Sequence, residues 1–172
     1  MGKIVRVLGL FFCLQSFVVA EVKIQVIDIE GKPVQNAVVS LPRADKSKPE
    51  LSAGSAEAMQ VAVMDQLDKQ FTPQVLVVKS GQFVVFPNSD QVRHHVYSFS
   101  KPNDFEIRLY SGNQAGPISF EYPGIVVLGC NIHDQMLGYI YVQDDEIARV
   151  SDQSGYVVFE ELDAYIPEQN VT

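Results

Sequence analysis

Residues 124–142 read GIVVLGCNIHDQMLGYIYV, and this stretch decides the expected fold. Valine, isoleucine and tyrosine favour strands, so residues 125–130 and 138–142 are expected to form two strands joined by a polar loop. The loop carries Cys130, His133 and Met136, each three residues from the next. At the end of a strand, this spacing folds a thiolate, an imidazole and a thioether around one point.

These three side chains predict a metal site. Two imidazoles, one thiolate and a weak axial thioether form the ligand set of a blue-copper site. The second imidazole must come from His94 or His95, which are the only other histidines in the chain. Methionine is a poor ligand for zinc, which disfavours that metal. Taken singly, Cys130 and Met136 could also be ordinary core side chains.

Residues 61–143 have the pattern of one all-β unit. Short runs rich in Val, Ile, Phe and Tyr are separated by Gly, Pro, Asn and Asp, as is typical of a β-sandwich or barrel. We therefore expect the metal at one end of such a unit. The expected strands are 61–64, 75–79, 82–86, 95–99, 105–109, 118–121, 125–130 and 138–142.

The two ends of the chain carry further strand patterns. Residues 22–41 and 150–162 each combine a turn with alternating apolar residues. Both segments resemble parts of the small sandwich modules related to carboxypeptidase regulatory domains. The resemblance implies that residues 21–60 and 144–172 form a split, Ig-like accessory β layer, into which the unit at 61–143 is inserted.

A second arrangement of these ends is equally compatible with the sequence, namely edge strands added to one enlarged sandwich. Insertion predicts that residues 22–27 or 36–41 lie beside residues 156–160. Residues 53–59 could form one helical turn.

Residues 1–20 form a separate segment. Lys3 and Arg6 precede an apolar run at residues 7–14, and the segment ends on small residues at Ala20. This pattern predicts a secretory signal peptide cleaved after Ala20, which places the mature protein in the periplasm. A membrane anchor is the alternative, but the run is shorter than the ~20 residues that a spanning helix needs. No later segment is expected to span a membrane.

Signal cleavage changes the cysteine count and the charge. Removal of Cys13 leaves Cys130 as the only cysteine, and a lone thiol in an oxidising compartment is a liability unless something such as a metal occupies it. The net charge of −8 becomes −10 once Lys3 and Arg6 are removed. An acidic surface disfavours nucleic acid and fits solubility or, more weakly, a basic partner.

Residues 75–142 resemble the plastocyanin and amicyanin group of cupredoxins. Residues 84–96, VVFPNSDQVRHHV, are similar to the stretch in which an Asn, and an Asp two residues on, precede the first ligand histidine. His94 lies six residues beyond Asn88 and four beyond Asp90. The Cys-x2-His-x2-Met loop is similar to the short loop of amicyanin. The resemblance implies a Greek-key sandwich that binds one type 1 copper ion.

That resemblance also implies roles for particular side chains. His94, Cys130, His133 and Met136 would hold the copper, and Asn88 and His95 would form hydrogen bonds that support the ligand loops. An arginine at 93, a histidine at 95 and the pair Leu128-Gly129 depart from residues that are frequent at these positions.

A narrower likeness concerns residues 94–100, HHVYSFS, and 129–134, GCNIHD. They resemble bacterial periplasmic proteins labelled methylamine utilization protein or plastocyanin-like. The expected activity is outer-sphere electron transfer without a catalytic residue, so the protein is not expected to be an enzyme. The expected partner is a cytochrome or a copper or quinone oxidoreductase, which would dock on Ile132, His133 and Leu137.

Two other functions remain open from the sequence. A periplasmic copper carrier or sensor could use the same residues without shuttling electrons. A hydrolase that uses Cys130 with a histidine is disfavoured, because the sequence has no oxyanion-donor motif and no orienting carboxylate beyond Asp134.

Overall fold

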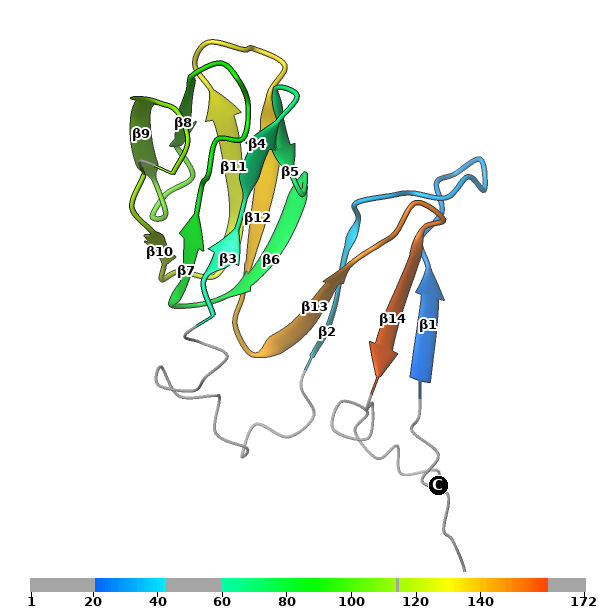
Figure 1. Cartoon of the computed structure of the whole chain (residues 1–172). Coiled ribbons are helices and arrows are strands. Elements are labelled where there is room, and N and C mark those ends of the chain that lie inside the picture. The colour runs from blue at the N-terminus through cyan, green and yellow to red at the C-terminus, as the bar shows by residue number, and fades with distance from the viewer. Residues whose placement is uncertain (1–20, 43–59, 114, 161–172) are drawn as a thin grey trace, which may run out of the picture.

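The computed structural model describes residues 21–42, 60–113 and 115–160 of the chain. Every regular element in these residues is a β-strand, which confirms the expected all-β class. Figure 1 shows a larger lobe, formed by residues 62–143, and a smaller lobe, to which both ends of the described chain contribute. The described residues include no helix of the length and apolarity that a membrane crossing requires.

A five-stranded sheet forms one layer of the larger lobe. In order across the sheet its strands are β6 (Val75–Lys79), β12 (Leu137–Gln143), β11 (Gly124–Cys130), β8 (His94–Ser98) and β9 (Phe105–Tyr110). Strand β11 is antiparallel to both β12 and β8, whereas β12 is parallel to β6. The two strands that flank the predicted ligand loop are therefore neighbours in the sheet.

A three-stranded sheet and a short hairpin form the opposing layer. The sheet contains β10 (Ile118–Phe120), β7 (Gln82–Val85) and β3 (Ala62–Val63), and the hairpin contains β4 (Asp65–Leu67) and β5 (Gln70–Thr72). Strand β7 is antiparallel to β10 and parallel to β3. The larger lobe is thus a mixed β-sandwich, in agreement with the expected architecture (Figure 1).

The core of the larger lobe lies between these layers. Residues in β8 and β12 alternate between buried and less buried positions, as strands with one inward face do. A buried aliphatic or aromatic side chain contributes about 1.5–3 kcal/mol. The buried apolar residues are Met64, Phe71, Val78, Val84, Phe86, Val96, Tyr110, Phe120, Val126, Leu128, Cys130, Met136, Ile140 and Val142. Two of the predicted metal ligands, Cys130 and Met136, therefore belong to the packed core.

The smaller lobe joins the two ends of the described chain. It contains β1 (Glu21–Gln25), β14 (Tyr156–Glu160), β2 (Val38–Pro42) and β13 (Glu146–Val150). Strand β1 pairs with β14, and β2 pairs with β13, both antiparallel. The expected approach of residues 22–27 to residues 156–160 is present, since Val22 lies opposite Phe159 in this ladder.

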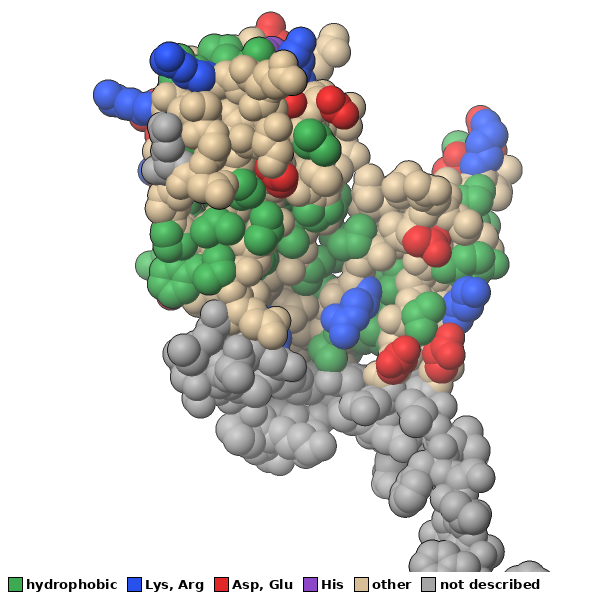
Figure 2. Space-filling view, in the orientation of Figure 1, with side chains coloured by type: hydrophobic (Ala, Val, Ile, Leu, Met, Phe, Trp, Pro, Cys, Tyr) green, Lys and Arg blue, Asp and Glu red, His purple; other side chains and the backbone are tan. Residues whose placement is uncertain are grey.

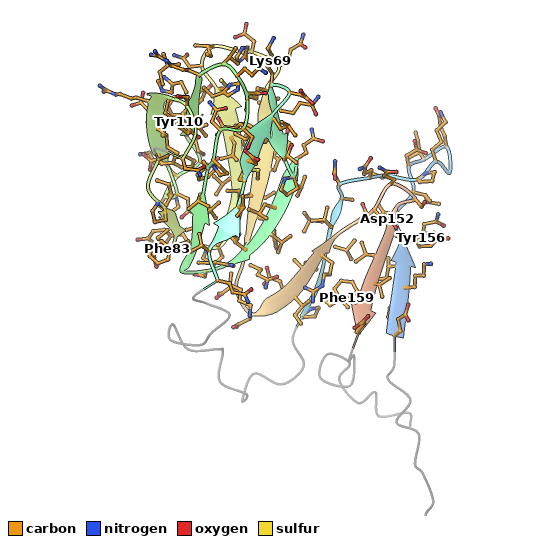
Figure 3. All side chains as sticks on the ribbon, in the orientation of Figure 1. Lys69, Phe83, Tyr110, Asp152, Tyr156 and Phe159 are labelled. Carbon is orange, nitrogen blue, oxygen red and sulfur yellow. The ribbon has the colours of Figure 1, made fainter. Side chains whose placement is uncertain are left out.

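A small core of its own stabilises this lobe. Val157 and Phe159 are buried and pack against partly buried residues of the paired strand β1 and of the other strand pair, β2 and β13. Figure 3 shows Phe159 on β14 in this lobe. The partly buried residues in contact with this pair are Val22, Ile24, Val39, Leu41 and Ile147.

Hydrogen bonds join the two lobes at the end of β12. The Gln143 Oε1 atom accepts a hydrogen bond from the Ala148 backbone N–H at 2.8 Å, and the Tyr141 hydroxyl donates to Glu146 at 2.8 Å. A side-chain hydrogen bond of 2.9 Å also joins Asn36 to Gln74. The chain therefore passes from β12 to β13 through a short connection with both ends fixed.

Three elements were not expected from the sequence. They are β4, β5 and β13, and the first two lie between the expected strands 61–64 and 75–79. Strand β8 also begins at His94, one residue earlier than expected. The signal peptide at residues 1–20 and the helical turn at 53–59 lie outside the described residues.

Candidate metal centre

The predicted ligand loop connects β11 to β12 at one end of the larger lobe (Figure 1). Cys130 is the last residue of β11 and is buried. The backbone N–H of Met136 donates to the carbonyl of His133 at 2.9 Å, which closes a tight turn. This turn brings His133 back toward the end of β11.

The alternation of β8 decides which of the two adjacent histidines faces inward. Along this strand His94, Val96 and Ser98 are buried, and the residues between them are only partly buried. Cys130 pairs with Val96 across the sheet. His94, which is 0% exposed, therefore projects toward Cys130, and His95 projects to the other face.

Three donor atoms converge at this end of the sandwich. The Cys130 Sγ atom lies 3.6 Å from Nδ1 of His94 and 3.7 Å from Nδ1 of His133. The two imidazole centroids are 4.9 Å apart. Among the described residues, this is the only group of three or more His, Cys, Asp or Glu side chains that lie close enough together to bind one metal ion.

The spacing of the donors fits a bound metal. A metal that binds sulfur at about 2.3 Å and nitrogen at about 2.0–2.1 Å, with angles between tetrahedral and trigonal, separates sulfur from nitrogen by about 3.6–3.8 Å. The two observed sulfur–nitrogen distances match this range. One thiolate with two imidazoles is a donor set that suits copper.

Met136 lies in the same loop as Cys130 and His133. Its side chain is only 1% exposed and packs in the main core. The hydrogen bond from its N–H to His133 fixes the backbone of the loop. Its role as an axial sulfur ligand stays a prediction.

Asp90 contacts the buried histidine and was missed as a site residue in the sequence. One of its carboxylate oxygens lies 2.7 Å from Nε2 of His94, on the ring edge opposite the donor nitrogen. The backbone N–H groups of Asp68 and Lys69 donate to the same carboxylate at 2.7 and 2.9 Å. The signals in the sequence were the place of Asp90 two residues after Asn88, in the stretch that resembles cupredoxins, and its separation of four residues from His94.

The pKa of Asp90 reflects these contacts. Burial acts to raise it, but the hydrogen bonds from the Lys69 amide, from His94 and from the Asp68 amide outweigh burial and hold the pKa below its ordinary value. Asp90 is therefore a carboxylate at neutral pH.

Asn88 supports this loop through hydrogen bonds to backbone groups. Its amide group donates to the carbonyls of Val92 and Tyr110 at 2.9 and 3.0 Å, and its Oδ1 atom accepts from the Asp90 backbone N–H at 3.0 Å. Asn88 thus fixes the turn that carries Asp90. Its expected supporting role is exerted through the backbone of residues 88–92.

The His95 side chain does not make the contact that we expected. Its imidazole lies 2.8 Å from Glu106 on the outer face of the sheet, away from the Cys130 loop. Instead, the His95 carbonyl accepts a hydrogen bond of 3.1 Å from the Asn131 backbone N–H. The two ligand loops are therefore joined at residue 95 by its backbone, because the side chain of a residue next to an inward-facing one must face outward.

The surface around His133 combines apolar and polar groups. Ile132 and Leu137 are 49% and 47% exposed. His133, which lies between them in the sequence, is partly buried. A groove of about 670 Å³ runs beside the loop and is also lined by Lys69 and Asp134. In Figure 2 part of a histidine side chain is visible at the surface at the end of the larger lobe, among charged side chains. Figure 3 places Lys69 at this same end.

A buried polar cluster lies behind the site. The Tyr110 hydroxyl donates to the carbonyl of Phe86 at 2.6 Å and accepts a hydrogen bond from the Gln66 side chain. Gln66 also donates to the Pro87 carbonyl at 3.0 Å. Burial raises the pKa of Tyr110 to about 12, although the hydrogen bond from Gln66 acts in the opposite direction.

Comparisons with known proteins give matches among solved structures alone. No family model and no curated protein matches the chain. A reduced amicyanin variant is 21% identical, with 62% of this chain and 98% of that chain covered and a TM-score of 0.45. The purple cupredoxin from Nitrosopumilus maritimus is 19% identical, with 48% and 99% covered and a TM-score of 0.43.

A copper-containing nitrite reductase from Thermus scotoductus SA-01 is 26% identical over 61% of this chain but only 27% of its own length, with a TM-score of 0.47. Because these TM-scores are below 0.5, the fold is assigned here from the strand order and the site. A two-layer sandwich of β3 to β12, with His94, Cys130 and His133 gathered at one end, gives residues 62–143 the cupredoxin-like fold that their sequence resembles.

Proposed function

We propose that the protein is an exported electron carrier that binds one type 1 copper ion through His94, Cys130, His133 and Met136. The observation that carries the proposal is the position of the Cys130 sulfur, 3.6 and 3.7 Å from the Nδ1 atoms of two histidines. When bound, copper supplies the Cu(II)/Cu(I) couple at this point. The mixture of sulfur and nitrogen donors suits both oxidation states.

The protein holds these donors in place in both states. Cys130 ends a strand in the centre of the sheet, and His94 begins the neighbouring strand. The hydrogen bond from Asn131 to the His95 carbonyl joins the two segments that carry them. Donors that cannot move far require little rearrangement when an electron arrives or leaves, which favours fast transfer.

Burial of the donors favours a carrier over an enzyme. His94 and Met136 are at most 1% exposed, and Cys130 is 4% exposed. Catalytic metal sites keep an open ligand position for water or substrate, whereas a closed site does not. Electrons can still enter through the imidazole of His133, which is partly exposed.

The surface and the sequence support a proposal for the partner and the location. The exposed apolar residues Ile132 and Leu137 beside His133 would dock a redox protein, such as a cytochrome or a copper or quinone oxidoreductase. The signal-like residues 1–20 support export to the periplasm. The excess of acidic residues argues against nucleic acid as a partner.

Cyclic voltammetry of the copper-loaded protein tests electron carriage directly. We expect one reversible one-electron wave and full retention of copper through repeated cycles. Loss of the metal on oxidation, with only Cu(I) retained, would support a copper carrier or sensor instead.

A further inference from the structure

The turn between β4 and β5 has an unusual backbone. Leu67 pairs with Gln70, which leaves Asp68 and Lys69 as a two-residue turn, and both have positive φ values of 52° and 58°. A hairpin turn with two positive φ values normally uses Asn, Asp or Gly followed by Gly, so the unusual residue here is Lys69, which reaches this region at a cost. This geometry points both backbone N–H groups to one side of the turn.

Both N–H groups bind the Asp90 carboxylate. Asp68 donates to Oδ1 at 2.7 Å, and Lys69 donates to Oδ2 at 2.9 Å. The same Oδ2 lies 2.7 Å from Nε2 of His94. The carboxylate is therefore held on one side by the turn and on the other by the buried ligand.

The hairpin is fixed to the loop that carries Asp90. The Asp65 carboxylate accepts hydrogen bonds from the Ser89 hydroxyl at 2.7 Å and from the Ser89 N–H at 3.2 Å. Backbone hydrogen bonds also join Gln66 to Pro87 and to Ser89, at 3.1 and 3.0 Å. Hairpin and loop thus form one unit, so the position of Asp90 does not depend on its own rotamer alone.

The arrangement determines which nitrogen of His94 carries the proton. A carboxylate only accepts hydrogen bonds, so Nε2 must be protonated where it meets Asp90. In a neutral imidazole the other nitrogen, Nδ1, then has a free lone pair, and it is Nδ1 that faces the Cys130 sulfur. A negative charge on the far side of the ring also makes Nδ1 a stronger donor.

The two histidine ligands differ in this respect. Within the described residues, His133 has ring contacts with Cys130 and His94 but no carboxylate partner. Only the buried ligand therefore has a charged group behind it. The His95–Glu106 pair, at 2.8 Å, provides a carboxylate–imidazole contact on a histidine that faces away from the site.

We propose that Asp90, held by the turn at Asp68 and Lys69, is a positioning residue that fixes the Nε2–H tautomer of His94 and favours Cu(II) over Cu(I). This inference rests on the proposed copper site. A more basic imidazole stabilises the more highly charged ion, so Asp90 lowers the reduction potential of the site. The hairpin at β4 and β5 is then part of the metal centre, although it supplies no ligand.

The test compares Asp90→Asn with Glu106→Gln. Both replace a carboxylate beside a histidine with an amide of the same shape, but only the first faces a predicted ligand. Competition titrations would measure the affinities for Cu(II) and for Cu(I) separately. We expect Asp90→Asn to lose at least tenfold more affinity for Cu(II) than for Cu(I), which raises the potential by about 59 mV, and Glu106→Gln to change neither.

Equal losses for both ions, or no loss, would overturn the inference while leaving copper binding intact. Absence of copper binding in the wild-type protein would instead refute the proposed function. Nitrogen-15 NMR of the metal-free wild-type protein gives an answer even if Asp90→Asn fails to fold. In the neutral form of the ring it should show the Nε2–H tautomer of His94, and a mixture of neutral tautomers, or the Nδ1–H tautomer, would contradict the inference.

Discussion

The Cys130 sulfur lies 3.6 Å from Nδ1 of His94, although 36 residues separate them in the chain. The contact exists because β11 and β8 are antiparallel neighbours, with Cys130 opposite Val96. The end of β11 therefore lies beside the start of β8. Three donors collected from two loops at one end of a rigid sandwich form the basis of the predictions that follow.

The two adjacent histidines should differ in their effect on copper. His94→Ala removes a buried donor and should abolish the blue absorption band. His95→Ala should retain it, because the contribution of residue 95 to the site is its backbone carbonyl, which alanine keeps. Absorption spectra of the two variants after addition of Cu(II) provide the measurement. A colourless His95→Ala variant beside a blue His94→Ala variant would exchange their roles.

The surface at Leu137 should control the rate of exchange with a redox partner. Leu137→Glu places a charge beside His133 on the predicted docking surface and should slow association by about tenfold, without a change in the absorption band. Leu109→Glu is the matched control, because Leu109 is similarly exposed but lies on β9. Stopped-flow kinetics with a cytochrome would measure both rates. Equal rates for the two variants would argue against docking at Leu137.

The buried hydroxyl of Tyr110 should contribute to stability. Tyr110→Phe removes the hydrogen bond to the Phe86 carbonyl and the acceptor for Gln66, and should lower the free energy of unfolding by about 1 kcal/mol. Urea denaturation measures the loss. Tyr122→Phe, at an exposed position, should be neutral.

The same tyrosine should also make stability depend on alkaline pH. An unfolded tyrosine releases its proton near pH 10.0, whereas burial raises the pKa of Tyr110 to about 12 in the folded protein. Between these values the unfolded state binds fewer protons, so stability falls as the pH rises from 10 to 12 and the contribution is fully present below pH 10. The difference in stability between Tyr110→Phe and wild type should shrink over this window, and a constant difference would contradict the assigned pKa.

Close packing at Gly138 should be essential for the hairpin of β4 and β5. A Cβ atom at this position would lie 2.8 Å from Cβ and Cγ of Phe71, a buried residue of β5. Gly138→Ala should therefore displace the hairpin and cost about 1–3 kcal/mol of stability. Gly116→Ala is the control, since nothing lies within 4 Å of its added Cβ. Thermal denaturation compares the two, and equal melting temperatures would show that Phe71 moves freely.

The sequence was most informative where the signal is local. Cys130, His133 and Met136 lie within one loop, so their spacing alone predicted that they share a site, and the structure brings Cys130 and His133 together. The choice of His94 depended on a family resemblance, and the burial of alternate residues in β8 gives the same answer independently. Most strands of the sandwich carried enough β-branched and aromatic residues to be predicted.

Other features depend on contacts between distant segments. Strands β4 and β5 have three residues each, too few for a hydrophobic period, and their turn at Asp68 and Lys69 has lysine at the position where glycine would mark it. The role of Asp90 could not be predicted without that hairpin. For His95, a frequent side-chain interaction of related proteins was expected, whereas its backbone makes the contact.

The central claim is that the Cys130 thiolate binds copper between two histidines. Cu(II) added to the mature protein should produce an intense thiolate-to-copper absorption band that saturates at one equivalent. Any Cu(II) that Cys130→Ser binds should give no such band, because Cys130 is the only free cysteine in the described residues and no other thiolate can replace it there. A wild-type protein that stays colourless with Cu(II), or a Cys130→Ser variant that keeps the band, would contradict the account.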